Sequence, residues 1–70
     1  MSEQWIASVV GEMHINRVSQ KDIAMQMNVT PEYVSAILNG HRTPVGAEQR
    51  FRAALDDIIR SRAERKKVEQ

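Results

Sequence analysis

This 70-residue chain contains no cysteine, which excludes both disulfide bonds and metal sites built from thiolates. Aromatic residues are scarce, being limited to Trp5, Tyr33 and Phe51, so any core has to be mainly aliphatic. No apolar run approaches the roughly 18 residues that cross a bilayer, and the first residues lack the pattern of a secretory signal. We therefore expect a single small domain in the cytoplasm, without membrane association.

The chain also lacks a large excess of either charge, since it contains ten basic and nine acidic residues and has a net charge of +1. The distribution is uneven, because residues 1–46 carry three basic and four acidic side chains, whereas residues 47–70 carry seven and five. The basic residues gather near the end, at Arg60, Arg62, Arg65, Lys66 and Lys67. Such a run is usually a solvated helix face or a frayed tail, and contact with nucleic acid is the alternative interpretation.

Apolar residues recur at helical spacing at both ends of the chain. A first helix is predicted over residues 2–14, with Ser2 as its N-cap, from the positions of Trp5, Ile6, Val9, Val10 and Met13. A last helix is predicted from Thr43 or Val45 to at least Arg60, from the stripe Phe51, Ala54, Leu55, Ile58 and Ile59. Little apolar material follows, so we predict a domain over residues 1–61 and a basic, frayed tail over residues 62–70.

Residues 19–40 carry the signals of two short helices joined by a tight turn. Ser19 can cap the first helix, and Asp22 stands three places later, as the acid of a capping box does. Asn28 tolerates the left-handed conformation that a turn needs, and Thr30 and Pro31 are typical of a second helix start. Asn39-Gly40 is a C-cap signal. The apolar residues expected to face inward are Ile23, Ala24 and Met27, then Val34, Ile37 and Leu38. This is a helix-turn-helix pattern.

Several short stretches within residues 19–44 stand at fixed spacing: Ser19-Gln20, Ile23-Ala24, Asn28-Val29-Thr30, Val34-Ser35 and Gly40-His41-Arg42-Thr43-Pro44. This pattern resembles the Cro-like and lambda-repressor-like DNA-binding family, except that Asn28 replaces the usual glycine of the turn. The resemblance implies an all-α, lambda-repressor-like domain of four to five short helices around a central helix-turn-helix. It also implies a sequence-specific transcriptional regulator, in particular a phage or bacterial repressor.

Phosphate contacts are expected around the helix-turn-helix. The resemblance implies that Gln20, Thr30 and Asn39 contact the DNA backbone, although Thr30 and Asn39 also serve as caps. Lys21 and Arg42 are basic residues beside the motif and are expected to bind phosphates as well.

Base reading is expected from the outward side of helix 31–38, inserted into the major groove. The residues predicted to face out are Glu32, Tyr33, Ser35 and Ala36. Glu32 can accept from a cytosine amine, Tyr33 and Ser35 can bond bases, and Ala36 can touch a thymine methyl group. Neither Arg, Lys, Gln nor Asn occurs in this helix, although these are the commonest base-reading side chains.

Enzymatic chemistry is not predicted. Neither Ser19 nor Ser35 has the histidine and orienting carboxylate of a triad, and Asp56 and Asp57 point about 100° apart on a helix. No glycine-rich phosphate loop is present, and His41 has only His14 as a partner, so we expect no cofactor, metal or small-molecule ligand.

Two functions remain open. The first is a regulator that binds double-stranded DNA as a homodimer, because one such module buries only about 600–1,000 Å². The alternative is a protein-interaction module that keeps the fold but modulates a host or repressor protein without reading an operator. The mild net charge and the composition of helix 31–38 favour this alternative.

Overall fold

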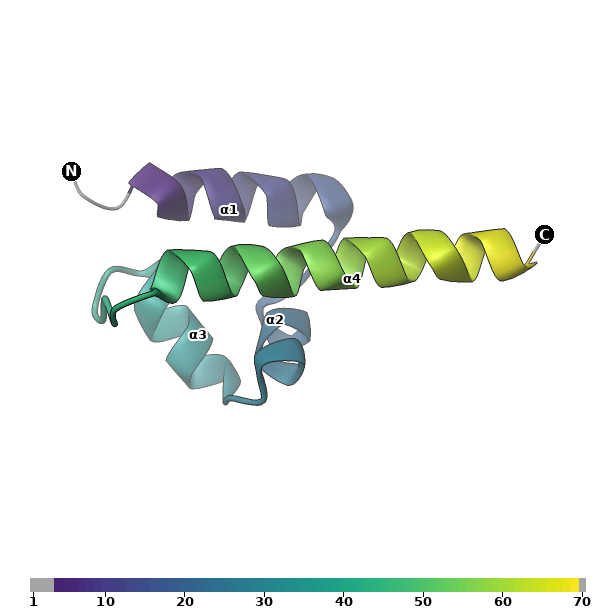
Figure 1. Ribbon diagram of the computed structural model, residues 1–70. Coiled ribbons are helices and arrows are strands. Elements are labelled where there is room, and N and C mark those ends of the chain that lie inside the picture. Colours follow the sequence, from purple (N-terminus) through teal and green to yellow (C-terminus); the bar gives the residue numbers. More distant parts are fainter. Residues whose placement is uncertain (1–3, 70) are drawn as a thin grey trace.

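The computed structural model of this chain describes residues 4–69, with side chains as far as Arg65. These residues form four helices, α1 (Gln4–Asn16), α2 (Gln20–Met27), α3 (Pro31–Leu38) and α4 (Ala47–Glu69), and no strand. α1 and α4 run side by side in the same direction, and α2 and α3 form an angled pair beneath α4 (Figure 1). The predicted all-α class is confirmed.

The start of α2 is a reciprocal capping box, as predicted. The Ser19 hydroxyl accepts a hydrogen bond from the Asp22 backbone N–H at 3.0 Å, and the Asp22 carboxylate accepts one from the Ser19 N–H at 3.0 Å. At the other end Asn28 adopts the left-handed conformation, with φ of 62°, and its N–H bonds the last turn of α2. The chain thus reverses direction within three residues.

The start and end of α3 also agree with the predicted signals. The Thr30 hydroxyl accepts a hydrogen bond from the Tyr33 N–H at 3.1 Å, and Pro31 occupies the first helical position. After Leu38, the Gly40 N–H bonds the Ile37 carbonyl at 3.1 Å and the His41 N–H bonds the Ala36 carbonyl at 2.8 Å. This pair of bonds is a Schellman motif, which requires the positive φ of 81° that Gly40 adopts.

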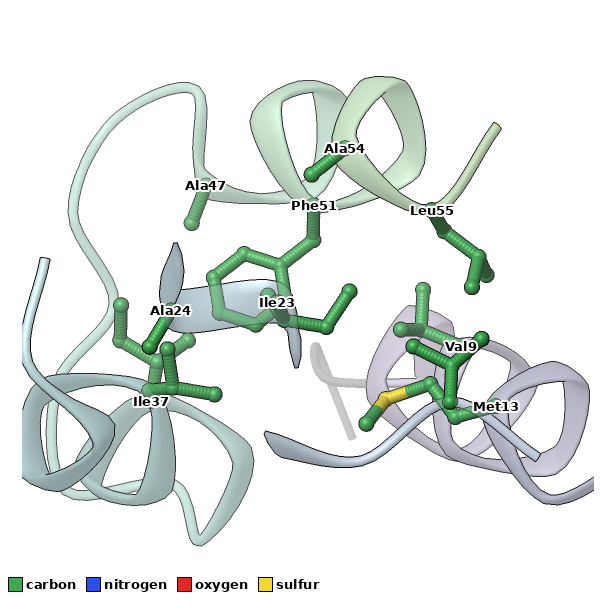
Figure 2. Close-up of a cluster of buried hydrophobic side chains, with 11 residues drawn as sticks. Val9, Met13, Ile23, Ala24, Ile37, Ala47, Phe51, Ala54 and Leu55 are labelled. Carbon is green, nitrogen blue, oxygen red and sulfur yellow. The ribbon is translucent and has the colours of Figure 1, made fainter. Parts of the chain in front are cut away.

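The core is aliphatic around one aromatic ring, and every helix contributes to it (Figure 2). Phe51 of α4 is fully buried, and the half-buried Trp5 of α1 meets its ring edge-on, with 5.8 Å between the ring centroids. The core cluster consists of Val9, Met13, Val18, Ile23, Ala24, Val34, Ile37, Ala47, Phe51, Ala54 and Leu55. This cluster fixes α3 against the body of the domain through Val34 and Ile37.

Two elements begin or end away from their predicted places. α1 ends at Asn16 rather than at residue 14, and Val10, predicted in its apolar face, is 40% exposed. The predicted cap Ser2 lies outside the described residues. α4 begins at Ala47, after Gly46 has completed a turn with a φ of 80° that a helix does not allow.

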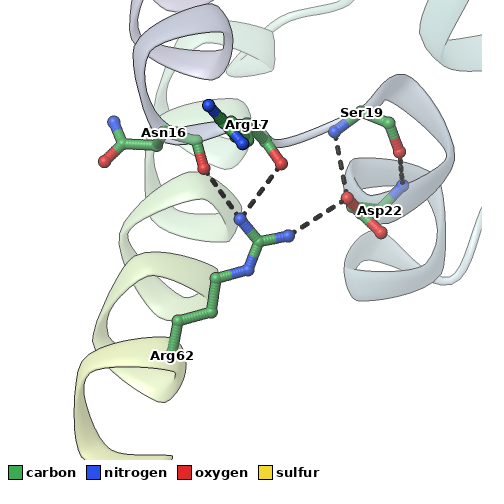
Figure 3. A network of polar contacts seen from close by, with 5 residues as sticks. All are labelled: Asn16, Arg17, Ser19, Asp22 and Arg62. Carbon is green, nitrogen blue, oxygen red and sulfur yellow. Dashed lines mark hydrogen bonds and ion pairs between the residues drawn. The ribbon is translucent and has the colours of Figure 1, made fainter. Parts of the chain in front are cut away.

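α4 remains helical to Glu69, beyond Arg62, where the sequence pattern predicts the start of a frayed tail. Arg62 is held by the end of α1 and the start of α2 (Figure 3). Its guanidinium donates to the Asn16 carbonyl at 2.8 Å, to the Arg17 carbonyl at 3.1 Å and to the Asp22 carboxylate at 3.3 Å. The predicted boundary after residue 61 therefore divides a continuous helix just before the residue that joins three elements.

Candidate nucleic-acid interface

Fewer residues of α3 are fully exposed than the sequence pattern predicts. Glu32 is exposed, as is Pro31 beside it, but the other three predicted base-reading residues, Tyr33, Ser35 and Ala36, are half-buried. Leu38, expected to be buried, is also half-buried. Within α3 the fully accessible residues are therefore Pro31 and Glu32, at its start.

Tyr33 is engaged on two sides. Its ring packs against the core cluster, and the guanidinium carbon of Arg42 lies over the ring, 5.7 Å from the centroid. Two residues predicted for different tasks, base reading and phosphate binding, are therefore in contact. The Schellman motif at Gly40 reverses the chain after α3 and allows Arg42 to return to Tyr33.

Ser35 and Asn39 are also brought together. The Asn39 side-chain amide donates to the Ser35 hydroxyl at 3.1 Å, one helical turn away. Ser35 keeps its own hydroxyl proton as a donor, whereas Asn39, an exposed residue at the end of α3, keeps its amide oxygen and second N–H. The contact links a predicted base-reading residue to a predicted phosphate-contacting one.

The remaining predicted phosphate-contacting residues lie at helix starts and are accessible. Gln20 and Lys21 are exposed in the first turn of α2, and Thr30 is exposed before α3. The Thr30 hydroxyl already caps α3, so it would act on a phosphate only as a donor. Backbone N–H groups at such helix starts carry the positive end of the helix dipole, which favours an anion.

Asp22 places a negative charge close to Gln20 and Lys21, and its surroundings stabilise the ionised form. The hydrogen bond from the Ser19 backbone N–H lowers the pKa of Asp22 below its ordinary value of 3.8. Partial burial opposes this shift, while the Ser19 hydroxyl and the charges of Arg62 and Lys21 add to it. The Asp22 carboxylate forms an ion pair with the guanidinium of Arg62, a residue of α4, at a distance of 3.3 Å (Figure 3).

The role of Arg62 in this region could not be predicted from the sequence. It was grouped with the basic residues of a frayed tail, yet it bonds backbone carbonyls 45 and 46 positions earlier. Contacts of this kind leave no periodic signal, because they depend on where α4 crosses the connector between α1 and α2.

Two other features bear on ligands. Among the described side chains, which extend from Gln4 to Arg65, no group of three His, Asp or Glu residues could hold a metal ion, and none of the helices described is long and apolar enough to cross a membrane. Arg62 lines two open hollows beside α4. One is mostly polar, with Met25 and Ile58 among Asp22, Gln26, Ser61 and Arg65, and the other contains Ile59 and Ala63 beside Asn16 and Arg17. No family model, curated protein or solved structure matches this chain.

Proposed function

We propose that this protein is a DNA-binding transcriptional regulator with a lambda-repressor-like fold, which inserts α3 into the major groove while α2 crosses the phosphate backbone. The observation that carries this proposal is the pair α2 and α3. Two capped helices of eight residues, joined by Asn28-Val29-Thr30, are held on the core so that Pro31 and Glu32, at the start of α3, remain exposed. Helix pairs of this kind are a common DNA-binding device.

The dimensions of α3 support this role. Eight residues extend about 12 Å, and a helix with its side chains is about 10–12 Å across, which suits a major groove about 12 Å wide. Glu32, exposed in the first turn, would accept a hydrogen bond from a cytosine amine. Gln20, Lys21, Thr30 and Arg42 would supply donors to phosphates on either side of the groove.

A homodimer is part of the proposal, because a single module of this size buries too little surface for tight binding. Two copies would place their α3 helices about 34 Å apart on a two-fold site. Met25 of α2 is 71% exposed and lines one hollow with Ile58 of α4, and we assign this hollow to the contact between copies.

The dimer surface is tested by sedimentation of two variants. Met25→Asp places a charge in the hollow and should shift the protein to monomer. Ile15→Asp is the matched control, since Ile15 is an apolar residue of α1 that is 81% exposed and lies outside the hollow. Equal behaviour of both variants would remove the assignment.

DNA binding is tested by a salt titration of duplex affinity. The logarithm of the affinity should fall linearly with that of the salt concentration, with a slope of about −0.9 per neutralised phosphate. Arg42→Ala should reduce this slope by about 1, whereas Arg60→Ala, a basic residue of α4 outside the predicted phosphate set, should leave it unchanged. Absence of duplex binding even at low salt would contradict the proposal.

That negative result would favour the alternative function, a module that modulates another protein. The observation behind this alternative is the composition of α3, which contains none of the four commonest base-reading residue types. In this alternative, Glu32 and the half-buried Tyr33 would contact the surface of another protein. The chain would keep its fold but would have no affinity for duplex DNA.

A further inference from the structure

Tyr33 and Arg42 form the one cation–π contact in the part of the chain that the structure describes. The Arg42 Cζ atom lies over the Tyr33 ring at 5.7 Å from its centroid, within the range in which such contacts are attractive. Tyr33 is half-buried and packs against the core, while Arg42 is exposed and forms no salt bridge with a described residue. An exposed cation thus lies over a ring that packs against the core.

The backbone on both sides of the pair is also fixed. The Tyr33 N–H bonds both the hydroxyl and the carbonyl of Thr30, each at 3.1 Å, which anchors the first turn of α3. On the other side, the bonds from Gly40 and His41 to the last turn of α3 direct the chain into Arg42. The contact therefore follows from local structure at both ends of α3.

We infer that Tyr33 is a platform that orients Arg42 toward one DNA phosphate, and that Tyr33 does not read bases. This inference rests on the proposed function; it keeps the phosphate-binding role predicted for Arg42 and replaces the base-reading role predicted for Tyr33. Tyr33 is in this sense a positioning residue, because it acts on the phosphate through Arg42.

The chemistry of the guanidinium group supports the inference. The N–H donors of a guanidinium lie in its plane, so a guanidinium whose face is turned to a ring keeps them available for the paired hydrogen bonds that a phosphate accepts. A free arginine side chain loses rotamer freedom when it binds, and prior ordering on a ring reduces that loss. The benefit should be equal for all sequences, because phosphates carry no sequence information.

The experiment measures the affinity of the full chain for two duplexes at low salt. One duplex is enriched from a random pool, and the other is a shuffled duplex of the same length and composition. The variants are Tyr33→Phe, which keeps the ring, Tyr33→Leu, which removes the ring but keeps apolar packing, Arg42→Ala and the double variant Tyr33→Leu/Arg42→Ala. Thermal unfolding checks that each variant folds, and Tyr33→Met replaces Tyr33→Leu if that variant does not.

Tyr33→Leu should weaken binding of both duplexes by the same factor, about 2- to 10-fold, as expected when one side chain must be ordered on binding. In the Arg42→Ala background the same change should have almost no further effect, and Tyr33→Phe should match the unsubstituted chain. NMR should show an upfield ring-current shift of the Arg42 side-chain protons that Tyr33→Leu abolishes.

Three results would overturn the inference while leaving the proposed function intact. The first is that Tyr33→Phe changes the relative affinity of the protein for the two duplexes. The second is that Tyr33→Leu weakens binding as much in the Arg42→Ala background as it does alone. The third is that Tyr33→Leu leaves the NMR shifts of the Arg42 side chain unaltered. If the unsubstituted chain binds neither duplex, the proposed function and the inference fail together.

Discussion

Arg62 joins three helices through one side chain, and its replacement by alanine tests how the domain holds α2 in place. The substitution removes the hydrogen bonds to the carbonyls of Asn16 and Arg17 and the ion pair with Asp22. The two carbonyls lie at the end of α1, where backbone acceptors lack partners within the helix. We expect Arg62→Ala to destabilise the domain without changing its fold.

The magnitude follows from the exposure of the group. A hydrogen bond to a charged donor contributes about 1.5–3 kcal/mol in buried settings, and an exposed ion pair about 0.2–1 kcal/mol. Because the Arg62 side chain is 43% exposed, water compensates for much of this loss, and we expect a total of about 1–2 kcal/mol. In a domain of this size 1 kcal/mol corresponds to about 4–8 °C in Tm, so the fall should be about 4–16 °C.

Urea and thermal unfolding followed by circular dichroism measure this change, and Trp5 fluorescence reports the core independently. Arg60→Ala is the matched control, because Arg60 lies on the same helix and, among the described residues, pairs only with Asp57, in an exposed ion pair of 3.5 Å. The control should lose less than about 0.5 kcal/mol. Equal stability of the two variants would refute the assignment of Arg62 as a clamp.

A double-mutant cycle separates the two parts of the clamp. Asp22→Asn removes the charge that Arg62 meets but leaves the carbonyls of Asn16 and Arg17 in place. Arg62→Ala should therefore still destabilise the Asp22→Asn variant, by most of its original effect. Full loss of that effect would show that the ion pair, rather than the carbonyl bonds, carries the stabilisation.

Three further predictions concern local structure. Because the pKa of Asp22 is lowered in the folded state, its carboxylate contributes its full stabilisation at pH values above the ordinary pKa of 3.8. This contribution is lost as the pH falls through the folded-state pKa. The free energy of unfolding, measured against pH, should therefore drop less steeply in Asp22→Asn. Gly40→Ala should lower the free energy of unfolding by about 1–2 kcal/mol, because Gly40 has a positive φ. Gly11→Ala should raise it by up to about 1 kcal/mol, because Gly11 is helical and the added Cβ has open space around it. A change of the same sign in both variants would contradict this explanation. Thr30→Ala should lower stability by about 1 kcal/mol through loss of the cap on the Tyr33 N–H, as read from urea unfolding, and an unchanged midpoint would mean that the cap is not stabilising.

Local signals in the sequence account for most of the helix-turn-helix. The capping box at Ser19, the left-handed turn at Asn28 and the start of α3 at Thr30 are each determined by residues within four positions of one another. Such features are predictable because the hydrogen bonds that define them are made by neighbours in the chain. The buried positions Val34 and Ile37 follow in the same way from helical spacing.

Features that depend on how helices cross were not predictable. Helical spacing placed Val10 in the core and Tyr33 on the surface, but the crossing of α1 and α4 leaves Val10 exposed, and the loop after α3 covers Tyr33. The sequence pattern predicts a frayed tail at Arg62 because Ala63 and Val68 are the only apolar residues beyond Ser61. Its partners are backbone carbonyls, which every residue possesses, so the sequence contains no mark of the contact.

The central claim is that the exposed start of α3 and the residues around it meet duplex DNA. Mapping of backbone amide shifts in a ¹⁵N-labelled sample, as duplex DNA is added at low salt, tests it most directly. We expect the largest shifts at Gln20 and Lys21, at Thr30–Tyr33 and at Arg42. Shifts confined to α1 and the far side of α4, or an unchanged spectrum, would contradict it.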